Sequence, residues 1–472
     1  MLSKSLFLRG WQCEKLLWFA ARKELPEPSL ADEMKFLDGA EVEVQAKKLF
    51  PGAVDLFGLS REDNLKQSKD LLKEGKTLFE ASFQFNDFFI RTDILKPINN
   101  GLHLFEIKAA SEPKDEHIPD LAFQKFVLEK LGFKVHKCFI LHLNKEYVKR
   151  GLINPVELIK KEDVSEKVGL LTNIELKANE FLNTIKNNTP NIPIGKHCNK
   201  PRECPLKPVC WSYLPEDNVF LLSNWRLYWK LFNNNILNLR DIPENTALSP
   251  KDEIIRKASL SKETFKDRKA IKAFLESLEY PLYHLDFETF QTAIPIYDES
   301  RPYQKIPFQF SVHIQNNDLK HFEFLASGEQ DPRIQLLKEL KKALEGKGSI
   351  ITYHKSFEET ILKELARDFP GHEEWINKAL ERIVDLRNPF KDMAYYNPLQ
   401  KGSTSIKKVL PAITGKTYDA LEIRDGGTAS AQYYYTHIKP KLNKKEETRK
   451  NLLKYCAQDT EAMAWIINEL EK

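Results

Sequence analysis

Two groups of three consecutive strand-like runs constrain most strongly what this chain can fold into. Turn-forming residues separate several of the runs, and helical patterns follow each group. The first group covers residues 77–85, 88–95 and 102–110, and the second covers 281–290, 307–315 and 320–326. Strands followed by alternating helices and strands predict an α/β fold built from layered sheets.

Helical spacing of apolar residues and breaks in the pattern divide the chain further. Within residues 1–215, this pattern predicts a further strand at 137–144 and helices over 4–22, 30–49, 117–131 and 154–186. In the last part it predicts a strand at 349–354 and helices over 333–344, 357–369 and 446–471. We therefore expect three parts: a first domain over 1–215, a helical connector over 216–275 and a second domain over 276–472.

The composition agrees with a folded protein of several domains. The chain has 472 residues, of which 42% are hydrophobic, so about two or three folded units are expected and disorder as the main state is excluded. No run approaches the roughly 18 apolar residues of a membrane span, and no secretory leader is evident. These features predict a cytoplasmic protein that does not bind membranes. The formal net charge of +4 says little about partners.

The first strand group carries an ordered series of charged residues. Glu106 and Lys108 are two apart in LFEIKA, so they share one strand face while Ile107 points into the core. Asp93 lies on the preceding strand, beside Glu106 across a hairpin, and Glu80 on the strand before adds another carboxylate. Paired carboxylates with a nearby cation suit magnesium-assisted phosphodiester cleavage. The alternative is a solvated, salt-bridged sheet edge.

Four cysteines form a second group, Cys13, Cys198, Cys204 and Cys210. In a reducing compartment clustered cysteines indicate a metal rather than disulfides. Four thiolates select zinc or an iron–sulfur cluster, and the spacing alone does not separate the two. The alternative is a set of unrelated buried thiols, which a charged, proline-rich loop disfavours.

A third group lies in the second half of the chain. Asp286 and Glu288 share one strand face in LDFET, and two adjacent carboxylates suggest a divalent cation between them. Tyr455 and Asp459 are four apart, so they share a helix face, and Glu358 follows a predicted strand. The alternative is an ordinary α/β domain with acidic residues on its surface.

The first group resembles the PD-(D/E)xK nuclease superfamily in its RecB-type branch. The resemblance rests on FEASF, RTDIL, FEIKA and DLAFQ, over about residues 77–130. It implies that Asp93, Glu106 and Lys108 are catalytic and that Gln124, on the helix face of Asp120, lies at the active site. Many such enzymes add a metal-binding histidine in an early helix. That helix, FLDGAEVEVQAKKLF, has none here, and Glu43 is the nearest candidate ligand.

The cysteines resemble those of the iron–sulfur branch of the same nucleases, which includes CRISPR-adaptation and AddB-type enzymes. These proteins bind a [4Fe–4S] cluster through one N-terminal cysteine and three that follow the nuclease core. The gap between Cys204 and Cys210 fits that pattern, whereas the gap between Cys198 and Cys204 is longer than the usual two residues. The resemblance implies a structural [4Fe–4S] cluster, with zinc as the alternative.

The third group resembles the DnaQ-like DEDD exonucleases of the ribonuclease H-like fold. The shared order is D-x-E, then an acidic residue after a strand, then Y-x3-D. It implies that carboxylates bind two metal ions and that Tyr455 orients the attacking water. Glu358 stands where those enzymes carry aspartate, and Asp385 is an auxiliary candidate ligand. The motifs LDFET, SFE and YCxxDT also resemble a bacterial family of uncharacterised function, in which this unit follows an iron–sulfur RecB-type nuclease.

Together these resemblances predict a metal-dependent nuclease with two centres. Mg²⁺ or Mn²⁺ would be bound by Asp93, Glu106, Asp286, Glu288 and Asp459. The expected substrate is single-stranded or end-frayed DNA, trimmed from a 3′ end by the second domain, with phosphates contacted by basic residues such as Arg22, Lys23, Lys125, Lys401, Lys407 and Lys408. No GxxxxGK[ST] loop is present, so a helicase partner, or another genome-maintenance or defence protein, would be a separate chain. The rival hypothesis is a non-catalytic nucleic-acid-binding scaffold with one decayed centre.

Overall fold

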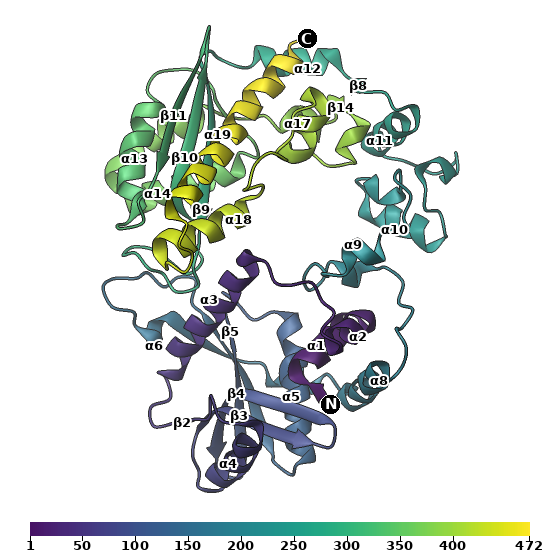
Figure 1. Cartoon of the computed structure of the whole chain (residues 1–472), viewed down its shortest axis with the longest axis vertical. Coiled ribbons are helices and arrows are strands. Elements are labelled where there is room, and N and C mark those ends of the chain that lie inside the picture. The colour runs from purple at the N-terminus through teal and green to yellow at the C-terminus, as the bar shows by residue number, and fades with distance from the viewer. The chain divides into compact units, whose positions relative to one another are not determined.

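A computed structural model describes every residue from Met1 to Lys472 and shows a mixed α/β protein (Figure 1). The chain forms two compact units. The first unit comprises Met1–Ser212 and the segment Thr292–Gln304, and the second comprises Tyr213–Gln291 and Lys305–Lys472. The predicted α/β class is therefore confirmed.

The first unit is built on a seven-stranded mixed sheet. Its strands run in the order β2-β3-β4-β5-β6-β7, and β1 pairs with β4. The β3–β4, β4–β5 and β6–β7 pairs are antiparallel, whereas β5 and β6 are parallel and are joined through a helix. The strand bounds are β1 Leu2–Ser3, β2 Val54–Asp55, β3 Leu78–Phe85, β4 Phe88–Ile98, β5 Gly101–Lys108, β6 Val135–Leu143 and β7 Ile159–Asp163.

Helices cover both faces of this sheet. Leu104 and Ile140 belong to a core that includes α1, α5 and α8, whereas Phe105 and Leu141 belong to a second core on the α3 side. Neighbouring strand residues point to opposite faces, so Glu106 and Lys108 lie on the α5 side. The helix bounds are α1 Lys4–Gln12, α2 Glu14–Ala21, α3 Leu30–Lys47, α4 Arg61–Lys73, α5 Ile118–Lys130, α6 Pro155–Leu158, α7 Ser165–Gly169, α8 Ile174–Lys186 and α9 Lys207–Cys210.

Two helix predictions in this unit are wrong. The helix expected over 4–22 is interrupted at Cys13, whose extended backbone ends α1 and begins α2. The helix expected over 154–186 is replaced by α6, β7, α7 and α8. Residues 159–163 pair with β6 instead. An open strand edge supplies hydrogen bonds that outweigh a weak local helical pattern.

The second unit is built on a five-stranded sheet in the order β11-β10-β9-β12-β13. The first three strands are antiparallel, and β12 and β13 run parallel to β9. The predicted strands are present as β9 Leu282–Phe290, β10 Ile306–Gln315, β11 Leu319–Leu325, β12 Ile350–Thr352 and β13 Ile383–Asp385. A separate two-stranded sheet pairs β8 Phe265–Lys266 with β14 Tyr395–Tyr396.

The long helix α19 lies across one face of the five-stranded sheet (Figure 1). Leu285 and Phe287 belong to the apolar core of the opposite face, with α13, α14 and α15. On the α19 side, the Gln309 side chain donates to the carbonyl of Leu452 at 2.9 Å. The helix bounds are α10 Trp225–Asn233, α11 Pro250–Ser261, α12 Arg268–Glu276, α13 Pro332–Ala343, α14 Ser356–Asp368, α15 Glu373–Glu381, α16 Asn388–Lys391, α17 Ile406–Thr414, α18 Gly426–Tyr433 and α19 Lys445–Leu470.

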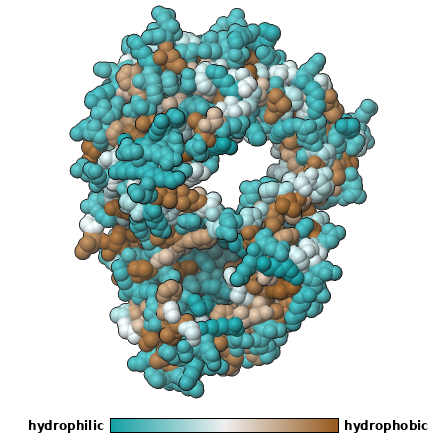
Figure 2. Space-filling model, in the orientation of Figure 1, coloured by the Kyte–Doolittle hydropathy of each residue, from teal (hydrophilic) through white to brown (hydrophobic).

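Residues 216–275, predicted as a helical connector, contain α10, α11 and most of α12 and lie within the second unit. Hydrophilic side chains cover much of the face seen in Figure 2, with smaller hydrophobic patches between them. None of the helices has the length and apolarity needed to cross a bilayer.

Candidate active site

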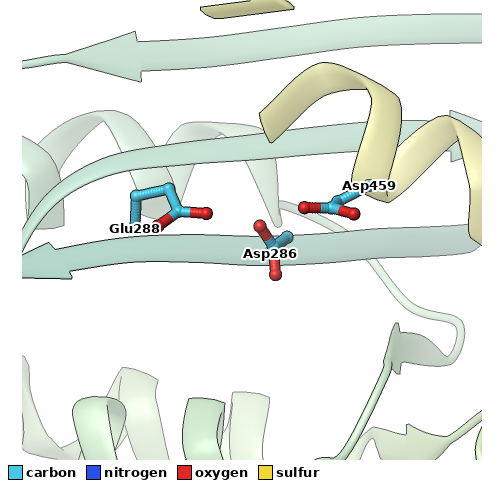
Figure 3. Close-up of side chains that lie close together, drawn as sticks. All are labelled: Asp286, Glu288 and Asp459. Carbon is cyan, nitrogen blue, oxygen red and sulfur yellow. The ribbon is translucent and has the colours of Figure 1, made fainter. Parts of the chain in front are cut away.

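Three carboxylates from two elements of the second unit converge on one point. Asp286 and Glu288 lie on the α19 side of β9, and Asp459 reaches them from α19 (Figure 3). One carboxylate oxygen from each residue lies within 4.8 Å of the others. The period of two on β9 and the packing of α19 over that strand produce this convergence.

Burial makes this group of three carboxylates electrostatically unfavourable. Glu288 and Asp459 are only 6% and 8% exposed, and Asp286 is half-buried. Burial, then Asp459, raises the pKa of Asp286 well above its usual value. Burial, then Asp286 and Asp459, does the same to the pKa of Glu288. Burial also raises the pKa of Asp459. Such a group gains stability from a cation or from protons.

Two tyrosines and a lysine border the acidic group. The Tyr418 hydroxyl donates to Asp459 Oδ1 at 2.5 Å. Tyr455, one turn before Asp459 on α19, accepts a hydrogen bond from Lys407 Nζ at 3.0 Å. Lys407 also lies over the rings of both tyrosines. Burial, then Asp459, raises the pKa of each tyrosine, so both hydroxyls stay protonated.

Glu358 lies close to this group but outside the set of three. It is in the first turn of α14, is 2% exposed, and its Oε2 has no hydrogen-bond partner. Burial, then Asp286, raises the pKa of Glu358 well above its usual value. Asp385 accepts hydrogen bonds from the backbone N–H groups of His354 and Arg387 at 3.0 and 2.9 Å. It therefore orders the loop before α14.

The first unit places two of its predicted acidic residues on neighbouring strands. Ile94 on β4 is paired with Phe105 on β5, which sets Asp93 opposite Glu106 as expected for a hairpin. Asp93 Oδ2 accepts a hydrogen bond from the Ile107 backbone N–H at 2.7 Å. Glu106 is 2% exposed, so the sheet holds a buried carboxylate beside a half-buried one.

The lysines bind this pair differently from the expected arrangement. Lys108 Nζ donates to Glu106 at 2.6 Å and to Asp120 at 2.7 Å. Lys4, at the start of α1, donates to both oxygens of Glu106 at 3.0 and 3.1 Å and to Asp93 at 3.4 Å. Lys4 Nζ also lies 3.7 Å from Asp120. The two ammonium groups therefore neutralise most of the acidic charge.

Gln124 completes this ion-pair network. Its side-chain amide donates to Glu106 at 2.7 Å and to Asp120 at 2.9 Å. Although burial and Asp93 oppose ionisation of Glu106, Lys108 and Lys4 lower its pKa. Burial opposes ionisation of Lys4 too, but the three carboxylates raise its pKa well above its usual value. Both Glu106 and Lys4 are therefore charged at neutral pH.

Glu80 lies on β3 between Phe79 and Ala81, which pair with β4, but is not itself paired. Its φ is +56°, a left-handed value that is costly for a residue with a Cβ. The Asn64 side chain donates to the Glu80 carbonyl and accepts from the Ser82 N–H, at 3.0 and 2.8 Å, which satisfies the backbone there. Burial, then Asp93 and Glu43, raises the pKa of Glu80 to about 7. Glu43 itself pairs with Lys47 at 2.5 Å.

The four predicted cysteines gather in the first unit as free thiols. Cys13 and Cys204 each interact electrostatically with the other cysteines of the group, and burial raises the pKa of both thiols. Leu16 and Leu206 pack around them. A bond from the Cys204 N–H to the Cys198 carbonyl, at 2.8 Å, shapes the loop. The interrupted helix at Cys13 places that thiol at the start of α2.

Comparisons with known proteins match only parts of the chain. Residues 283–405 match a protein family described as a domain of unknown function, DUF2779. That segment includes Asp286, Glu288 and Glu358 but ends before Tyr455 and Asp459. The chain is 25% identical over 217 residues to "Uncharacterized protein MG366 homolog" of Mycoplasma pneumoniae, covering 41% of this chain and 32% of that protein.

A second relative is "Uncharacterized protein MG366" of Mycoplasma genitalium. It is 27% identical over 208 residues, covering 39% of this chain and 31% of that protein. The chain thus matches about a third of the length of these relatives.

The two acidic groups differ in how well they could bind a divalent cation. The second unit offers carboxylate oxygens with few cationic partners, which is the hard donor set that Mg²⁺ and Mn²⁺ prefer. The first unit offers similar oxygens, but ammonium groups already occupy them. Sequence reasoning missed Lys4 and Tyr418. A lysine in an N-terminal helix carries no signal of a partner about a hundred residues away in the sequence.

Proposed function

We propose that this protein is a metal-dependent nuclease whose principal centre is formed by Asp286, Glu288 and Asp459. The observation that carries the proposal is the convergence of these three carboxylates, two buried and one half-buried, within 4.8 Å, with raised pKa values. A fold keeps such a repulsive group when a divalent cation neutralises it.

The surrounding residues suit phosphodiester hydrolysis. A divalent cation bound there supplies an activated water and charge neutralisation for the leaving oxygen. Tyr455 keeps its proton, so its hydroxyl can orient water by hydrogen bonding, whereas the Tyr418 hydroxyl already donates to Asp459 and positions that carboxylate. Lys407 places a positive charge at the edge of the acidic group, where a phosphate would approach. The resemblance to DnaQ-like exonucleases agrees with these roles and favours trimming of a 3′ end.

The first unit supports a second, RecB-type centre less directly. Asp93 lies opposite Glu106 on neighbouring strands, Gln124 on α5 donates to Glu106, and Lys108 bridges Glu106 and Asp120. Lys4, however, binds the oxygens that a divalent cation would need. This observation favours the rival hypothesis for the first unit alone, namely a nucleic-acid-binding scaffold with a decayed centre beside an active second unit.

The four thiols fit a structural metal centre. Their sulfur donors would suit a [4Fe–4S] cluster or zinc, and the electrostatic interactions of Cys13 and Cys204 with the other cysteines support this proposal. Such a centre would fasten the N-terminal helices to the loop at 198–210. We propose single-stranded or end-frayed DNA as the substrate, and a helicase or another genome-maintenance or defence protein as the partner.

A digestion assay tests this function. Single-stranded DNA and RNA, labelled at either end, are incubated with Mn²⁺ and wild type, Asp286→Ala, Lys108→Ala or the exposed control Asp318→Ala. Substituting a residue that only hydrogen-bonds to a metal ligand lowers activity by roughly 10–100-fold. We expect Asp286→Ala, which removes a ligand itself, to lose more nuclease activity than that, and Asp318→Ala to keep the activity of wild type. If wild type leaves both substrates intact, the scaffold hypothesis replaces the nuclease.

A further inference from the structure

One cavity of the first unit combines basic residues with the edge of the ion-pair network. Its volume is about 680 Å³, which is within the usual range of ligand pockets. Arg9 from α1 and Lys200 and Arg202 from the cysteine loop line it, together with Lys108 and Asp120. The cavity therefore runs from the cysteine loop to the buried carboxylates.

Arg9 and Arg202 both line this cavity, and neither forms an ion pair with one of the acidic residues that line it. Arg9 is half-buried, and its electrostatic neighbours are Arg202 and Cys204. Asp115 and Glu116 also line the cavity, but Arg9 does not interact with either. Two guanidinium groups kept together in this way form a binding site for an anion.

The fold fixes the backbone positions from which the two arginines extend. Gln12, one turn after Arg9 on α1, donates to the carbonyls of His197 and Arg202, both at 2.9 Å. These bonds tie the loop that carries Arg202 to the helix that carries Arg9. Trp11 also lines the cavity and offers an aromatic face of the kind on which bases stack.

We infer that Arg9 and Arg202 bind backbone phosphates of a single nucleic-acid strand and lead that strand towards Lys108. The inference rests on the proposed nuclease function for its choice of ligand, since guanidinium pairs bind phosphate groups in general. A free nucleotide offers the same chemistry as a strand, so the test separates the two. The cysteine loop thereby acquires a role in holding substrate, because it carries Lys200 and Arg202.

The test measures binding without cleavage. Labelled single strands of DNA and RNA, about 15 nucleotides long, are titrated in EDTA and followed by fluorescence anisotropy at several salt concentrations. The proteins are wild type, Arg9→Gln, Arg202→Gln, the double variant and the control Arg150→Gln, an exposed arginine of the same unit that pairs with Glu299. Thermal unfolding verifies that each variant folds, and Arg202 is exposed.

We expect the double variant to raise the Kd for a strand about tenfold at low salt. The slope of log K against log salt should fall by about 0.7 for each phosphate that the variant no longer binds, and Arg150→Gln should match wild type. An unchanged Kd and slope in folded Arg202→Gln and in the double variant would overturn the site. Mononucleotide binding as tight as strand binding would overturn the strand as ligand. Because EDTA prevents metal-dependent cleavage, the binding measurement is independent of the outcome of the digestion assay.

Discussion

Asp286 on β9 and Asp459 on α19 hold carboxylate oxygens within 4.8 Å of one another. The two residues come from distant parts of the sequence, and each is buried or half-buried. Together with Glu288 they form an anionic group that destabilises the fold unless protons or a cation neutralise it. This relationship makes stability, pH and divalent ions interdependent in the second unit.

Stability in a chelating buffer should fall as the pH rises. The carboxyls Asp286, Glu288, Glu358 and Asp459 all have raised pKa values in the folded protein. A raised folded pKa gives stability that is complete below the unfolded value, near 4, and is lost as the pH climbs through the folded value. Hydrogen exchange of β9 and α19 in EDTA should therefore accelerate, beyond the intrinsic rise with pH, as the pH rises above about 4.

The double variant Asp286→Asn/Glu288→Gln serves as the control for that pH dependence. It removes two of the four titrating groups, so the pH dependence of local opening in β9 should become shallower. Equal pH profiles for wild type and the double variant would show that the acidic group does not control the stability of this unit.

Neutralising one carboxylate should stabilise the chelated protein. Asp286→Asn removes repulsion with Asp459 and Glu288, so we expect the free energy of unfolding to rise by about 1–2 kcal/mol. Each kcal/mol corresponds to a rise in Tm of about 2–4 °C. Saturating Mn²⁺ should raise the Tm of wild type, because a ligand at a hundredfold excess over its Kd adds about 2.7 kcal/mol. It should shift the variant much less. A lower Tm for Asp286→Asn in EDTA would contradict this account.

Removing Lys4 should destabilise the first unit and create a demand for a cation. Lys4→Met leaves the buried carboxylates of Glu106 and Asp120 with one ammonium group fewer. We therefore expect the free energy of unfolding to fall by about 3 kcal/mol. Mn²⁺ should then restore part of that loss by replacing the ammonium group. Thermal unfolding with and without Mn²⁺ measures both effects.

The matched control for Lys4→Met is Lys69→Met, an exposed lysine on α4 of the same unit. It should change neither the Tm nor the response to Mn²⁺. If Lys4→Met behaves like Lys69→Met, the ammonium group of Lys4 does not compensate the buried carboxylates.

The cysteine group should hold a metal centre in anaerobically purified protein. We expect iron and sulfide with broad absorbance near ~400 nm, which is typical of an iron–sulfur cluster. Cys204→Ser should lose that absorbance, whereas Cys138→Ser should keep it because Cys138 lies in the apolar core. Colourless protein with stoichiometric zinc would refute the cluster and retain a structural metal. Protein without bound metal would refute both.

The sequence predicted the elements whose periodicity is strong. The strand runs that carry Asp93, Glu106 and Asp286 form strands, and their period of two places the acidic residues on the expected faces. The spacing of four predicted that Tyr455 and Asp459 share a helix face, and both lie on α19. Local patterns were sufficient in these cases because each depends on residues close together in the chain.

Several interactions between distant parts of the chain were not predicted. The strand β7 forms because residues 159–163 meet the open edge of β6, and the sequence there contains no turn signal that predicts it. Lys4 reaches Glu106 because β1 pairs with β4 and sets the start of α1 over the sheet. Tyr418 similarly reaches Asp459 from a loop with no acidic motif of its own.

Counting the Mn²⁺ ions that the protein binds tests whether Asp286, Glu288 and Asp459 form a metal site. Free Mn²⁺ is followed by electron paramagnetic resonance at about pH 8, where protons compete little with Mn²⁺ for the carboxylates. The proteins are wild type, Asp286→Asn/Asp459→Asn and the exposed control Asp318→Asn. We expect wild type and Asp318→Asn to bind at least one Mn²⁺ more than the double variant does. Equal binding by all three proteins would contradict it.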